Sequence, residues 1–120
     1  MRILNTNIDT TNKKDVYKLT KKEAQRIQDL EKGVSLTVDA FALYEEDKTR
    51  TKKDGSTEDY VETVLAIVSG GLKVATISPT FIKSFMEIVE LMDGDPFSII
   101  ITGGTSKGGR DYVNCELDCD

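Results

Sequence analysis

The stretch FSIIITGGTSKGGRDYVNCEL, residues 97–117, decides the fold that we expect for this chain. Large apolar residues occupy every second position before and after its glycine-rich centre, namely Phe97, Ile99, Ile101, Val113, Cys115 and Leu117. Alternation with a period of two on both sides of a turn predicts a β-hairpin that buries one face. Residues 103–110 are expected to form its loop, where glycine allows the backbone to approach a ligand closely.

The chain before this hairpin predicts three strands and one long helix. Apolar and alternating runs predict strands over 34–44, 60–68 and 72–77, while residues 45–59 hold no apolar side chain and predict a long exposed loop. Ser78 and Pro79 predict a helix start, a broad apolar stripe follows, and Gly94 predicts the helix end. Phe41 falls on the otherwise polar face of the first strand, so it is a free aromatic ring, or the strand turns its far half onto a second layer, or a bulge changes the phase.

The N-terminal third of the chain carries weaker signals. Residues 1–14 are polar and predict a flexible arm or an edge strand, and residues 15–19 predict a short strand. Thr20 and Glu23 have the spacing of a capping box, which predicts a short helix over about 21–31.

This order of elements predicts an all-β protein with one main helix. Three strands, a helix and a final hairpin are the layout of the OB-fold, a five-stranded barrel, here with the helix between strands three and four and an extra short N-terminal helix. A single OB-like domain is expected over 15–117, after the arm at 1–14 and before a short acidic end at 118–120. An open α+β sheet with two helices on one face would use the same segments.

Composition limits the classes of function. The chain has 120 residues, a formal net charge of −5, no histidine and two cysteines. No apolar run approaches the ~20 residues that span a bilayer, and no signal peptide is evident, so we expect a cytoplasmic protein without membrane contact. We expect no metal site, no cofactor and no enzyme activity, because too few ligands are present and the commonest general base is missing. GGTSKGG precedes a strand and is therefore not a P-loop.

The OB layout points to two loops as the ligand-binding region. In OB-folds the ligand lies across strands two and three, between the loop that joins strands one and two and the loop that joins strands four and five. These loops are 45–59 and 103–110. Aromatic rings near the strand ends that could stack on bases are Phe41, Tyr60 and Tyr112. Basic side chains that could contact phosphates are Lys48, Arg50, Lys52, Lys53, Lys73, Lys107 and Arg110. A flexible hairpin and solvated charge runs remain the plainer alternatives.

Three segments of the chain resemble a known family. TSKGGRDYVNC after an Ile-rich strand, VYKLTKKEAQRIQDLEKG followed by LTVDAFALYEED, and ISPTFIKSFMEIVE are similar to segments of small single-stranded-DNA-binding proteins from tailed phages of Gram-positive bacteria. The resemblance spans about residues 15–117 and implies an OB-like fold, coating of single strands during phage replication and no catalytic activity. By position, the family's loop motif corresponds to Thr105, Ser106, Lys107 and Arg110, and its aromatic positions correspond to Phe41, Tyr44, Tyr60, Tyr112 and Tyr17. The end CELDCD is far shorter than the acidic tail of bacterial relatives.

The sequence therefore predicts sequence-independent binding of single-stranded DNA during phage replication or recombination. The alternative is an OB-like interaction module that acts on a replication or host-defence protein, a reading that the acidic net charge favours slightly. The sequence leaves open whether the protein forms a homodimer.

Overall fold

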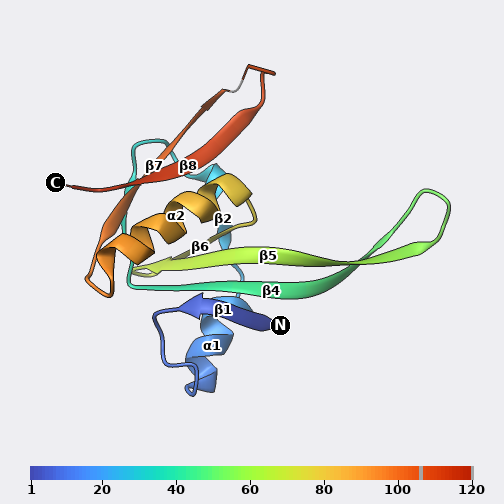
Figure 1. Cartoon of the computed structure of the whole chain (residues 1–120), viewed down its shortest axis with the longest axis horizontal. Helices are drawn as coiled ribbons and strands as arrows, with labels where there is room; N and C mark the ends of the chain where they lie inside the picture. Colours follow the sequence, from blue (N-terminus) through green and yellow to red (C-terminus); the bar gives the residue numbers. More distant parts are fainter. Residues whose placement is uncertain (106, 120) are drawn as a thin grey trace.

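The computed structural model describes residues 1–105 and 107–119, which form two β-sheets and two α-helices (Figure 1). In chain order the elements are β1 (Arg2–Thr6), α1 (Lys13–Thr20), β2 (Gln25–Arg26), the 3₁₀ turn η1 (Ile27–Asp29), β3 (Ser35–Thr37), β4 (Ala40–Thr51), β5 (Thr57–Ser69), β6 (Leu72–Thr76), α2 (Pro79–Met92), β7 (Ser98–Thr105) and β8 (Asp111–Leu117). One sheet has the strand order β1-β4-β5-β6-β2 and is mixed, because β2 runs parallel to β6. The other sheet has the order β3-β7-β8.

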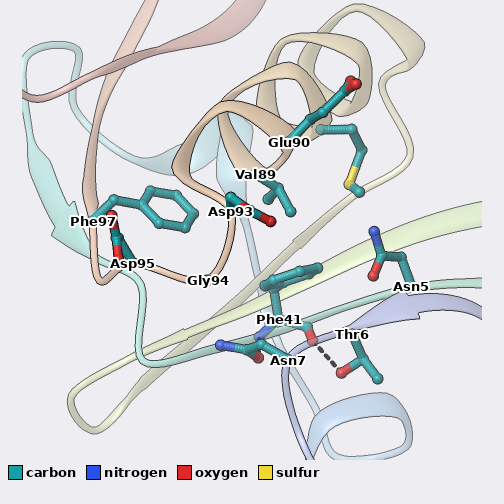
Figure 2. A pocket seen from close by; sticks show the side chains of 11 residues that line it. Asn5, Thr6, Asn7, Phe41, Val89, Glu90, Asp93, Gly94, Asp95 and Phe97 are labelled. Carbon is teal, nitrogen blue, oxygen red and sulfur yellow. Dashed lines mark hydrogen bonds between the residues drawn. The ribbon is translucent and has the colours of Figure 1, made fainter.

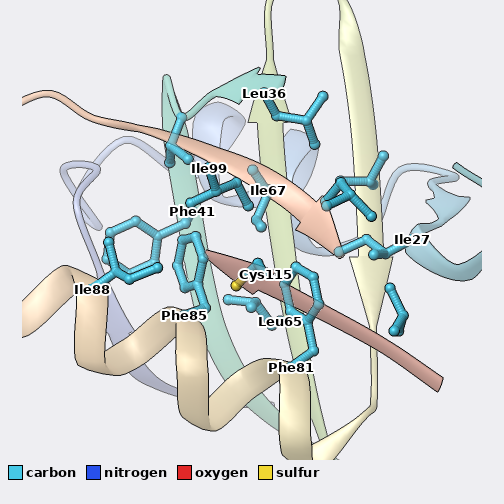
Figure 3. Packing of buried hydrophobic residues seen from close by; sticks show 14 residues of the cluster. Ile27, Leu36, Phe41, Leu65, Ile67, Phe81, Phe85, Ile88, Ile99 and Cys115 are labelled. Carbon is cyan, nitrogen blue, oxygen red and sulfur yellow. The ribbon is translucent and has the colours of Figure 1, made fainter. Parts of the chain in front are cut away.

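Helix α2 fills the space between the two sheets. Phe81, Phe85 and Ile88 project from it into a core that also contains Leu65 of the larger sheet and Ile99 of the smaller one (Figure 3). The Ser78 hydroxyl accepts a hydrogen bond from the Phe81 amide at 3.3 Å, and Pro79 is the first helical residue, as the sequence predicted. Through Phe81, Phe85 and Ile88, helix α2 joins the two sheets in one core.

The C-terminal hairpin is confirmed as strands β7 and β8. Its predicted inner face is buried at Ile99, Ile101, Val113 and Cys115. The connecting turn is shorter than expected, because Gly103 and Gly104 pair with Val113 and Tyr112 and so belong to β7.

The predicted strand over 34–44 is divided into β3 and β4 at Val38 and Asp39. Asp39 holds the division, since its amide donates to the Val68 carbonyl at 2.9 Å and its carboxylate accepts from the Gly70 amide at 2.6 Å. The division changes the phase of alternation, so Phe41 joins Leu36 in the main core. A change of phase, one of the alternatives given for Phe41, is thus the explanation for its burial.

The predicted loop over 45–59 is wrong. β4 continues to Thr51 and β5 begins at Thr57, so a long two-stranded ribbon projects from the body of the molecule and only residues 52–56 turn (Figure 1). Because both of its faces are exposed at its far end, the ribbon has no apolar alternation that would identify it as a strand pair.

The N-terminal predictions also need correction. Residues 15–19 belong to helix α1 instead of a strand, because the Asn12 side chain caps that helix by accepting from the Asp15 amide at 3.2 Å. Thr20 ends α1 and forms no capping box, so residues 21–31 contain β2 and η1 instead of a helix. Arg2–Thr6 forms edge strand β1 on β4, which is one of the two alternatives for the N-terminal arm.

The architecture is mostly β with two helices, but it is not the closed five-stranded barrel that the sequence predicted. Among the described residues, β6 pairs with β5 and β2 only, and no ladder joins it to β8, so the sheets stay open on that side. The two helices lie on opposite faces of the larger sheet, since Leu19 of α1 packs on Ala42 and Tyr44 while α2 packs on Phe41 and Leu65. No helix in the described part of the chain has the length and apolarity needed to cross a membrane.

Candidate nucleic-acid interface

The β4–β5 ribbon carries four of the predicted phosphate contacts but is acidic as a whole. Residues 45–62 hold seven acidic and four basic side chains. Lys48 Nζ lies 3.6 Å from a Glu62 carboxylate oxygen, and Arg50 Nε lies 3.3 Å from a Glu58 carboxylate oxygen. The cross-strand register thus places an acid beside each of these two bases, which weakens any attraction to phosphate.

The tip of the ribbon differs from its stem. Lys52 and Lys53 lie in the turn, are exposed, and have no ion pair within the described residues. Two isolated cations at a tip offer phosphate contacts but no ring for a base.

Tyr60 is the candidate ring on the part of the ribbon that projects from the body of the molecule. Its side chain is half-buried, and the Arg50 guanidinium lies 4.5 Å from the ring centroid. One face of the ring is therefore covered by a cation–π contact, which leaves Tyr60 less available for base stacking.

Two further candidate rings belong to the interior, and their selection as stacking residues is wrong. Phe41 is 3% exposed and contacts Phe85 edge-on with ring centroids 5.4 Å apart. Tyr44 is buried on the other side of the sheet, where its hydroxyl donates to the Thr20 carbonyl at 3.1 Å. Burial is the main reason that the pKa of Tyr44 is raised, with the nearby carboxylates of Glu46 and Glu62 adding to it. Neither ring offers a free face.

Lys73 on β6 also has a local role. Its ammonium donates to the Lys22 carbonyl, and partial burial lowers the pKa of Lys73. This contact holds the segment after α1 against the sheet.

On the β7–β8 hairpin, the predicted ring of Tyr112 is exposed and lies over the backbone of the neighbouring strand. Tyr112 is 48% exposed and lies opposite Gly104 in the strand register. A Cβ atom at Gly104 would lie 3.2 Å from the Tyr112 hydroxyl oxygen, so the ring rests directly on the glycine backbone. The absence of a side chain at Gly104 therefore sets the position of the ring.

Lys32 belongs to the same place and was missed by the sequence reasoning. A Cβ atom at Gly103 would lie 2.6 Å from Lys32 Cε, which shows that the lysine side chain crosses the strand at that glycine. Gly33 fixes this approach, because its amide donates to the Ile101 carbonyl at 2.7 Å and its φ of 92° suits glycine. Only this contact between distant parts of the chain could have identified Lys32.

Together these residues enclose a shallow cavity of about 350 Å³ that Gln28, Lys32, Gly104 and Tyr112 help to line. Lys107 and Arg110 lie in the adjoining turn and are exposed. Of the loop motif, Thr105 donates its hydroxyl to the Asp111 carboxylate at 3.2 Å, and Ser106 lies outside the described residues. We name Lys32, Gly104, Lys107, Arg110 and Tyr112 the hairpin site.

The two cysteines are free and differ in environment. Cys115 is buried on β8, where burial, with a smaller contribution from the Glu116 carboxylate, raises the pKa of its thiol to about 12. Cys119 is exposed. In the described part of the chain, no three His, Cys, Asp or Glu side chains gather as a metal site would require.

Comparison with known family models, with curated proteins and with solved structures gives no significant match to this chain.

Proposed function

We propose that this protein binds and coats single-stranded DNA without sequence preference during the replication or recombination of a phage genome. The observation that carries the proposal is the hairpin site, where the exposed Tyr112 ring rests on Gly104 beside Lys32. A ring with an open face accepts any base, because every base has a π-face, and each stacked base contributes ~1–3 kcal/mol.

The proposed binding mode combines this ring with three cations. One base stacks on Tyr112, while Lys32, Lys107 and Arg110 contact the phosphates on either side of it. Three phosphate contacts to a single strand predict a salt dependence with a slope of roughly −2. Binding of this kind is weak for one copy, so coating requires a high protein concentration or contacts between neighbouring copies.

The connectivity of the sheets supports an OB-like fold for this function. The chain from Ser35 to Thr51 pairs with β7 through β3 and with β5 through β4, and so links the two sheets side by side. A Greek-key barrel that is only partly closed is the form in which OB-folds bind oligonucleotides. The open side between β6 and β8 is compatible with that form.

The test is fluorescence anisotropy with a labelled oligothymidine long enough for one copy, compared with a duplex of equal length. We expect tighter binding to the single strand, and Tyr112→Ala should weaken it by roughly 5- to 150-fold. Ile77→Ala is the control, because Ile77 is an exposed apolar side chain that follows β6 and lies outside the hairpin site. Equal affinity for both nucleic acids, or no binding to either, would refute the proposal.

A protein-interaction module is the second candidate, favoured by the acidic ribbon. Its excess of carboxylates suits a basic surface on a replication or host-defence protein. Capture of such a protein that resists nuclease, together with no oligonucleotide binding, would select this function.

A further inference from the structure

A cavity of about 620 Å³ opens beside the C-terminal end of α2 (Figure 2), and none of its described lining residues belongs to the hairpin site. Its base consists of apolar side chains from both layers of the core, Phe41, Met86 and Phe97. Phe97 and Met86 are only half-buried, so an incoming apolar group would cover them.

The opening of this cavity carries negative charge that no described lining residue neutralises. Glu90, Asp93 and Asp95 line it, all three are exposed, and none of its described lining residues is basic (Figure 2). The last turn of α2 contains no basic residue, so the negative end of the helix dipole adds to the three carboxylates. The cavity therefore suits a group that is apolar at its tip and carries positive charge around it.

Helix α1 of the same chain has this chemistry. Tyr17 is 59% exposed, although it is a large aromatic residue. Lys14 and Lys18 lie one turn apart beside it, both are exposed, and neither has an ion pair within the described residues. Tyrosine is one of the residues enriched among those that anchor protein interfaces, and the two lysines supply the positive charge around it.

A copy of the protein cannot fill its own cavity with its own α1. Leu19 holds α1 on the face of the sheet that carries Ala42 and Tyr44, while the cavity lies on the opposite face, which carries Phe41. The two complementary surfaces can therefore meet only between copies.

We propose that α1 of one copy docks in the α2-end cavity of a second copy, with Tyr17 against Phe97 and with Lys14 and Lys18 facing Glu90 and Asp95. The contact joins two different surfaces, so the rotation between neighbouring copies decides whether it extends into a row or closes into a ring or a pair. The inference does not depend on DNA binding, because neither surface includes the hairpin site.

Charge reversal on each surface gives a direct test by sedimentation velocity, without DNA. One variant carries Lys14→Glu and Lys18→Glu, and the other carries Glu90→Lys and Asp95→Lys. Each variant should stay monomeric where the natural sequence associates, because like charges then face each other. An equimolar mixture of the two should associate again, since each cavity meets an α1 of opposite charge.

Controls separate this contact from general charge effects. Glu31→Lys changes the net charge at an exposed position outside both surfaces and should associate as the natural sequence does. Tyr17→Ala should weaken association by roughly tenfold or more. Circular dichroism confirms that each variant is folded. A natural sequence that stays monomeric near ~1 mM, a mixture that stays monomeric, or charge-reversed variants that associate on their own would each overturn the proposal.

Discussion

The β4–β5 ribbon and the β7–β8 hairpin share a backbone arrangement and differ in what surrounds their basic side chains. Both are antiparallel strand pairs with basic residues near a turn. In the ribbon, Lys48 and Arg50 face Glu62 and Glu58 across the strands, and Arg50 also covers Tyr60. In the hairpin, the Tyr112 ring rests on glycine with Lys32 beside it. Under the proposed function, cross-strand register, and not the number of cations in a segment, favours the hairpin over the ribbon as the surface that holds a nucleic acid.

The largest expected effect is on the free energy of unfolding, which should fall much more when an interior ring is removed than when a surface ring is removed. Phe41→Ala removes a ring that is buried against Phe85, and should lower the free energy of unfolding by ~3–5 kcal/mol. Tyr112→Ala should change it by less than ~1 kcal/mol. Urea denaturation followed by circular dichroism measures both values. Similar losses for the two variants would show that Tyr112 is a structural residue of the hairpin.

Glycine substitutions sharpen the comparison between the two strand pairs. Gly103→Ala places a Cβ atom against the Tyr112 carbonyl and Lys32, and should cost ~1–3 kcal/mol together with most of the single-strand affinity. Gly55→Ala in the ribbon turn meets no atom within 4 Å and is strained only by its φ of 87°, so single-strand affinity should be kept. Thermal melts and anisotropy on the same samples measure both properties. Equal loss of affinity would place the ribbon turn in the binding site.

The exposed Tyr112 and the half-buried Tyr60 should differ in their contribution to the free energy of single-strand binding. Tyr112→Ala is expected to remove ~1–3 kcal/mol of single-strand binding, while Tyr60→Ala should remove much less, because Arg50 already covers one face of that ring. Anisotropy titration at one fixed salt concentration gives the difference. A greater loss in Tyr60→Ala would move the site to the ribbon.

The smallest expected effect is a change in salt dependence. Lys32→Ala should reduce the slope of log affinity against log salt by about 0.7, the value of one phosphate contact to a single strand. Lys48→Ala should leave the slope unchanged, because this lysine faces Glu62. Titrations at several salt concentrations measure the slopes. An unchanged slope in Lys32→Ala would remove Lys32 from the site.

Periodicity predicted the parts of the fold where one face is buried and the other is not. The hairpin around Ile99 and Val113 and the helix after Ser78 were identified because core packing imposes a regular spacing on their apolar residues. The ribbon has no such spacing, since both of its faces are exposed, and it was taken for a loop. At the N-terminus the spacing of Thr20 and Glu23 predicted a capping box, but the side chain of Asn12 caps the helix and Thr20 ends it.

The candidate site was predicted only in part, because it combines near and distant residues. Tyr112, Lys107 and Arg110 come from one stretch of sequence and were identified there. Lys32 comes to lie beside Tyr112 because the Gly33 amide donates to the Ile101 carbonyl, and the sequence neighbours of Lys32 do not indicate that contact. Phe41 was misplaced because the break at Asp39 shifts the alternation by one residue.

The difference in exposure between the two thiols allows one of them to be labelled selectively. At pH 7 to 8 a thiol whose pKa is about 12 stays protonated, so Cys115 should not react with maleimides while the protein is folded. Cys119 is exposed to solvent and follows strand β8 in a segment without secondary structure. A fluorophore can therefore be attached at one position of the natural sequence, where it would report the approach of DNA or of a neighbouring copy without an engineered cysteine.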